Sequence, residues 1–102
     1  MSAADWVREK NPAAPKELLR AMASALEVPS GGSVTAQLVS ASRTLARRVT
    51  AEGCADRSRA LDLLTLDALI TGAMESAATS PAECEAAASS ILSAISEAAA
   101  IE

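Results

Sequence analysis

Five of the nine basic residues in this 102-residue chain lie between positions 43 and 59. They are Arg43, Arg47, Arg48, Arg57 and Arg59. Such a cluster could bind an anionic ligand, a nucleic-acid backbone or an acidic partner. Alternatively, arginines near a helix end complement its dipole and pair with acidic residues of the same chain. We favour the internal pairing, because the sequence has a single aromatic residue for base stacking, no glycine-rich phosphate loop and no recognition-helix signature.

The two cysteines, Cys54 and Cys84, are the only residues of a type that often holds a structural metal. A zinc site needs four ligands at short spacings, so we expect neither a metal nor another cofactor. If the last two helices form an antiparallel hairpin, the cysteines lie on the order of 30 Å apart, at about 1.5 Å per residue. We therefore expect two free thiols. With no signal peptide at the N-terminus, this favours a cytoplasmic protein.

The sequence lacks most of the residue combinations that are common in active sites. There is no histidine, so the commonest general base near neutral pH is missing, and the thirteen serines have no imidazole partner. We expect a protein without enzymatic activity, and we assign no catalytic, cofactor-binding or metal-binding residue.

The elements that must position these residues are all helices. Proline, glycine and serine divide the chain into a short helix over about 2–10 and longer ones over about 15–26, 33–52, 56–78 and 81–100. Serines at positions 2 and 80 are typical of helix N-caps. No segment alternates apolar and polar residues as a strand would. We predict an all-α fold, a small up-and-down bundle of four helices over residues 15–102. A short N-terminal helix and a proline-rich link over residues 1–14 precede it.

The fourth of these segments is apolar nearly all round, which is typical of a helix buried on several sides. We therefore place it at the centre of the bundle or in a subunit interface. No uninterrupted apolar run is long enough to span a membrane, and we expect no membrane partner. The candidate interface residues are Trp6, Leu63, Leu66, Ile70 and Met74, with Ile91 and Ile95 from a row formed by Cys84, Ala88, Ile91, Ile95 and Ala98. Trp6 could equally cap the bundle or be inserted into another protein.

Charge is unevenly distributed along the chain, although the net charge is only −4. Residues 60–102 carry seven acidic residues and no basic one. Antiparallel packing would return Glu97 and Glu102 beside the arginine cluster. The acidic last helix is therefore the internal partner that we expect for these arginines.

Residues 60–75, ALDLLTLDALITGAME, resemble one helix of the trans-polyprenyl diphosphate synthases, an all-α family. The resemblance covers less than a fifth of the chain, and Leu66 stands where the family usually has glycine. The family binds magnesium and diphosphate through clustered aspartates, and this sequence has no Asp-Asp pair. The resemblance therefore implies a non-catalytic relative or an accessory subunit, and no catalytic residue is carried over.

Only 24 side chains, counting Leu, Ile, Val, Met and Trp together, are bulky enough to fill a core. A chain so composed must pack its alanines closely or bury apolar surface against another chain. We predict a helical protein-interaction or assembly module that binds itself or another protein, as a homo-oligomer or a small subunit. Anion binding by the arginine cluster and an accessory role in isoprenoid synthesis are the alternatives.

Overall fold

The computed structural model describes residues 2–27, 32–51 and 57–100, and within these ranges the regular elements are helices, with no strand. The helices are α1 (Ala3–Lys10), α2 (Lys16–Ala25), α3 (Val34–Ala51), α4 (Arg57–Ala77) and α5 (Pro81–Ala100). These bounds confirm the predicted all-α fold with its short N-terminal helix.

Serine side chains begin three of the helices. The N–H of Asp5 donates to Ser2 Oγ at the start of α1, and the N–H of Glu83 donates to Ser80 Oγ at the start of α5, both over 3.1 Å. Ser33 accepts in the same way at the start of α3. Each bond satisfies a backbone donor that has no partner inside the helix. The two N-caps predicted from the sequence are therefore confirmed.

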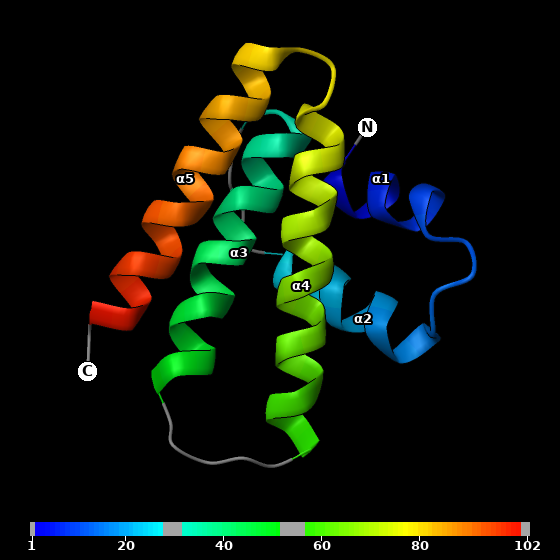
Figure 1. Ribbon diagram of the computed structural model, residues 1–102. Helices are drawn as coiled ribbons and strands as arrows, with labels where there is room; N and C mark the ends of the chain where they lie inside the picture. Colours follow the sequence, from blue (N-terminus) through cyan, green and yellow to red (C-terminus); the bar gives the residue numbers. More distant parts are fainter. Residues whose placement is uncertain (1, 28–31, 52–56, 101–102) are drawn as a thin grey trace.

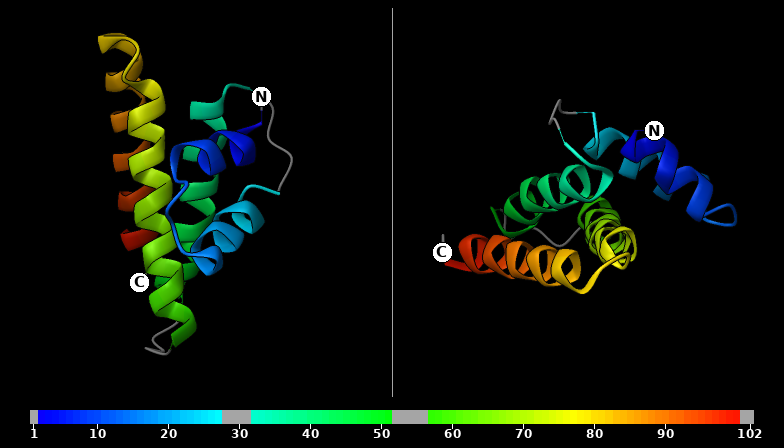
Figure 2. Two further views of the ribbon diagram at one scale, coloured as in Figure 1. Left: turned by 90° about the vertical axis from the view of Figure 1, so that its right-hand side faces the viewer. Right: turned by 90° about the horizontal axis from the view of Figure 1, so that it is seen from above.

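The three long helices run up and down, so that α3 and α5 are parallel and α4 is antiparallel to both (Figure 1). In the view from above, α4 and α5 lie on the side that faces the viewer in Figure 1, and α3 lies behind them (Figure 2, right). The short helices α1 and α2 lie obliquely across the other side of α3 and α4. The long helices thus form two layers, with α4 and α5 in the outer one.

The core lies between α3, α4 and the short helices. Its largest fully buried apolar side chains are Met22, Leu38 and Leu69, one from each of α2, α3 and α4. Helix α3 packs against both α4 and α5 more extensively than those two pack against each other. The helix covered on most sides is therefore α3. Of the two places predicted for the fourth segment, the centre of the bundle belongs to α3 instead, because an apolar surface all round a helix does not say how many neighbours cover it. Its place in a subunit interface stays a prediction.

Trp6 belongs to the packing of its own chain. It is half-buried against the core, and its Cζ3 atom lies 3.4 Å from where a Cβ atom at Gly72 would be. The Nζ of Lys10 lies 6.0 Å from the centroid of the Trp6 ring. Trp6 thus lies between α1 and α4 of its own chain, and its predicted insertion into another protein stays a prediction.

Candidate protein-docking face

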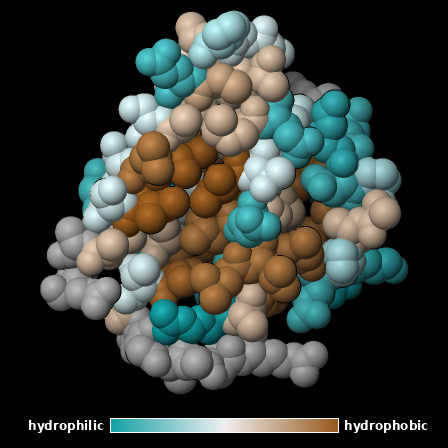
Figure 3. Space-filling model, in the orientation of Figure 1, coloured by the Kyte–Doolittle hydropathy of each residue, from teal (hydrophilic) through white to brown (hydrophobic). Residues whose placement is uncertain are grey.

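Large apolar side chains remain exposed on the outer layer of the bundle. On α4 they are Leu63 and Leu64, with 50% and 60% of their surface accessible, and on α5 they are Leu92 and Ile95, with 66% and 43%. A space-filling view of this side shows apolar side chains gathered over α4 and α5 (Figure 3). We call these four residues the α4–α5 face.

On α4, the exposed residues continue a row that enters the core. Leu63, Leu66, Ile70 and Met74 follow one another at helical spacing. Leu66, Ile70 and Met74 are half-buried and pack against the core, whereas Leu63 is half-exposed. The predicted interface row is thus one continuous strip of α4 that emerges from the core.

On α5, the buried row differs from the predicted one. The buried residues are Ala87, Ile91, Ala94 and Ala98. Ile91 and Ala98 belong to the predicted row, but Cys84 and Ala88 are only half-buried and Ile95 is exposed. The difference arises because α5 packs mainly on α3, and the side that it turns to α3 is rotated from the side that carries Ile95.

The face is open because α4 and α5 spread apart. The turn over residues 78–80 holds them together at one end, and they diverge toward the other (Figure 1). Their neighbour α3 lies on the inner side of the pair and leaves the outer side uncovered (Figure 2).

Sequence reasoning missed two residues of the face, Leu64 and Leu92. Each directly follows another large apolar residue, Leu63 and Ile91 respectively. Successive residues on a helix point about 100° apart, so a single neighbouring helix cannot cover both members of such a pair. Such pairs indicate that a helix carries apolar residues on two sides, although Leu69 and Ile70 form a similar pair that the fold covers.

The charge around the face is acidic. Asp67 is three residues beyond Leu64 and four beyond Leu63, so it lies beside both on the surface of α4. Glu75 follows Leu64 by eleven residues and lies on the same side of α4. Glu85 precedes Leu92 by seven residues and lies on the same side of α5. All three acids are exposed, and none forms an ion pair with another residue in the described ranges.

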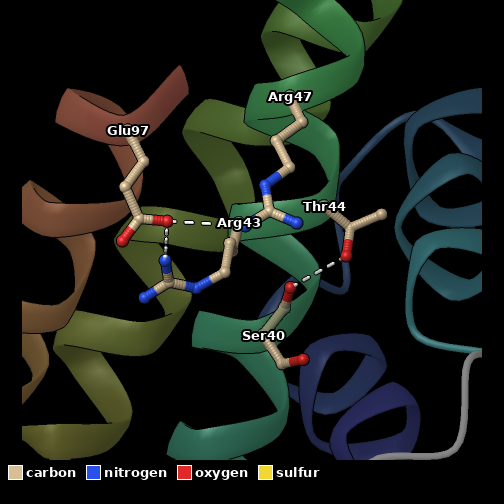
Figure 4. Close-up of polar contacts among 5 residues, drawn as sticks. All are labelled: Ser40, Arg43, Thr44, Arg47 and Glu97. Carbon is tan, nitrogen blue, oxygen red and sulfur yellow. Dashed lines mark hydrogen bonds and ion pairs between the residues drawn. The ribbon is translucent and has the colours of Figure 1, made fainter. Parts of the chain in front are cut away.

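The arginines of α3 pair with two other acids of the outer layer, Glu97 and Asp62. Arg43 donates to Glu97 Oε1 over 2.7 Å, and Arg47 donates to the same oxygen over 3.4 Å (Figure 4). The hydrogen bond and positive charge of Arg43, with a smaller effect of Arg47, lower the pKa of the Glu97 carboxyl. Arg48 donates to Asp62 on α4 over 3.0 Å.

These contacts show the expected pairing with the last helix for Arg43 and Arg47, whereas Arg48 pairs with α4 instead. Arg59 is half-buried in the first turn of α4. The side chain of Arg57, together with Cys54 and Glu102, lies outside the part that the structure describes.

Little else in the described ranges is arranged for chemistry. They contain no group of three Cys, Asp or Glu side chains that could hold a metal ion. Cys84 is a half-buried free thiol. A shallow groove of about 400 Å³ between α3 and α5 is lined mainly by small side chains, with Arg43 and Glu83 as its charged members.

None of the helices, over the residues that are placed, has the length and apolar character needed to cross a membrane. No family model matches the chain, and no curated protein or solved structure is significantly similar to it.

Proposed function

We propose that this chain is a non-catalytic protein-association module, and that the α4–α5 face docks a polypeptide of different sequence. The observation that carries the proposal is the exposure of Leu63, Leu64, Leu92 and Ile95 in a chain that has few bulky side chains. Complete burial of one such side chain contributes about 1.5–3 kcal/mol. Covering this face therefore provides a substantial driving force for association.

Charge favours a different polypeptide over a second copy. If two copies met through this face, Asp67 and Glu85 of one would approach the same acidic surface of the other. Neither α4 nor α5 carries a basic residue beyond position 59 that could pair with them. Like charges brought together at an interface oppose association. The same acids would repel an anionic lipid surface.

The test is to measure the native mass of the untagged protein in extracts of its own cells. The same measurement is made on the double variant Leu92→Ser/Ile95→Ser. We expect the wild-type protein to be part of a complex with a second polypeptide, and the double variant to be found at the mass of a single 10.3 kDa chain. The control is Ala86→Ser, an exposed position on another side of α5, which should leave the complex intact.

Three results would count against the proposal. The first is a wild-type protein that runs as a single chain in these extracts, and the second is a complex that the double variant retains in full. The third is a complex made only of copies of this chain, which would assign the face to self-association instead.

A further inference from the structure

We infer that the partner presents an amphipathic helix to the α4–α5 face, with lysine or arginine on both sides of its apolar stripe. This inference rests on the proposed function and adds the chemistry of the partner. It follows from two observations, the uncovered outer side of the α4–α5 pair and the acids around the face that form no ion pair within the described ranges.

The shape of the face suits a helix. On α4, the row that runs from the exposed Leu63 to the half-buried Met74 is about 16 Å long at 1.5 Å per residue. Leu92 and Ile95 belong to α5, the helix beside α4 in the same layer, and the apolar surface extends over both helices (Figure 3). A helix laid over two neighbouring helices buries apolar residues at positions i, i+3, i+4 and i+7. With α3 on the inner side of the α4–α5 pair and the partner helix on the outer side, the assembly would be a four-helix bundle.

The acidic charge around the face favours basic residues beside the apolar stripe of the partner helix. Asp67 adjoins Leu63 and Leu64 on α4, and Glu85 lies on the side of Leu92 on α5. Asp62 and Glu97 already bind arginines of α3, so they are less available to a partner. Asp67, Glu75 and Glu85 have no such ion pair in the described ranges. Basic residues beside the apolar stripe would meet these acids, whereas acidic ones would be repelled.

The test is a selection from displayed helices of about 20 residues with a fixed leucine stripe. The positions beside the stripe are randomised among Lys, Glu and Gln, and the target is the full-length protein at low salt. We expect at least a tenfold enrichment of Lys over Glu at these positions. Affinity for the selected helices should fall as salt is added, because exposed charge pairs are screened.

Two variants divide the possible outcomes. In Asp67→Asn/Glu75→Gln/Glu85→Gln, the preference for Lys should disappear while some binding through the leucine stripe remains. In Leu64→Ser/Leu92→Ser, binding of every helix should be lost. All five positions are exposed, and unchanged melting temperatures and circular dichroism would show that both variants fold.

The inference and the proposed function fail in different ways. Enrichment of Glu or Gln, or no preference, with binding that still requires Leu92, overturns the basic flanks but leaves the docking face in place. Self-association that Leu64→Ser/Leu92→Ser abolishes would replace the partner helix with a second copy. If no helix binds the wild-type protein better than the Leu64→Ser/Leu92→Ser variant, the docking face itself is rejected.

Discussion

Arg43 and Glu97 join α3 to α5 through a 2.7 Å contact between residues 54 positions apart. The two helices are parallel, and the residues that α5 buries are mainly alanines. Alanine rows alone hold the position of one helix along another weakly, because their side chains are short. The partly exposed ion pair adds one specific contact between the two helices.

This ion pair predicts how stability depends on pH. The Glu97 carboxyl has a lowered pKa in the folded protein, so ionised Glu97 stabilises the fold. That contribution is complete above the pKa of Glu97 in the unfolded chain, and it is lost as the pH falls through the lower folded value. We expect Glu97→Gln to melt below the wild-type protein at pH 7, and the difference to shrink as the pH is lowered through the acidic range.

The control for this prediction distinguishes the two arginines. Arg43 has the larger effect on the pKa of Glu97, and Arg47 is the more distant partner. In a titration of the Glu97 carboxyl followed by NMR, Arg43→Gln should raise the pKa more than Arg47→Gln does. Equal effects, or none, would contradict this account of the Glu97 environment.

The burial pattern predicts very different costs for two leucine substitutions. Leu69 is fully buried, so Leu69→Ala should destabilise the protein by about 2–5 kcal/mol through lost apolar contacts and a cavity. Leu92 is 66% exposed, and Leu92→Ala should change the free energy of unfolding by no more than about 0.5 kcal/mol. Chemical denaturation of the isolated protein measures both. A loss at Leu92 as large as that at Leu69 would show that Leu92 is covered in the free protein.

The cap of α5 predicts a moderate loss of stability. Ser80→Ala removes the side-chain oxygen that accepts from the N–H of Glu83, and should cost about 1 kcal/mol. Ser89→Ala is the matched control, because Ser89 is exposed in the interior of the same helix. There alanine should slightly increase the stability, since it has the higher helix propensity. Thermal unfolding followed by circular dichroism compares the two variants.

The contact between α1 and α4 depends on the size of residue 72. A Cβ atom at Gly72 would lie 3.4 Å from Trp6 Cζ3 and 3.7 Å from the nearest Leu38 side-chain atom, which is ordinary van der Waals contact. Gly72→Ala should therefore stabilise the protein by up to about 1 kcal/mol, because glycine is a poor helix former. Gly72→Leu should instead displace Trp6 and destabilise the fold. Trp6 is the only tryptophan, so its fluorescence reports the displacement directly.

The ends of the helices could be predicted because they are set by local chemistry. Ser2 and Ser80 act on backbone groups within three residues of themselves, so the sequence alone contains the whole interaction. The pairing of the arginines with Glu97 could also be expected from the segregation of charge along the chain. Both predictions rest on interactions with few alternatives.

The neighbours of each helix could not be predicted in the same way. Periodicity shows that Ile91 and Ile95 are apolar and nearly aligned on α5, but the direction of α3 decides that Ile91 is buried and Ile95 exposed. The periodicity of the sequence also does not show how far α4 and α5 spread apart. The docking face therefore became visible only from the arrangement of the helices in space.

The alanine-rich contact of α5 also bears on local unfolding. Of the apolar side chains that α5 buries, only Ile91 is larger than alanine, whereas α3 buries Leu38, Leu45 and Val49. Because the free energy of local opening increases with buried apolar area, we expect backbone amides in α5 to exchange with solvent sooner than those in α3. The helix that carries Leu92 and Ile95 should thus be held less firmly than α3, and a molecule docked on it would slow this exchange.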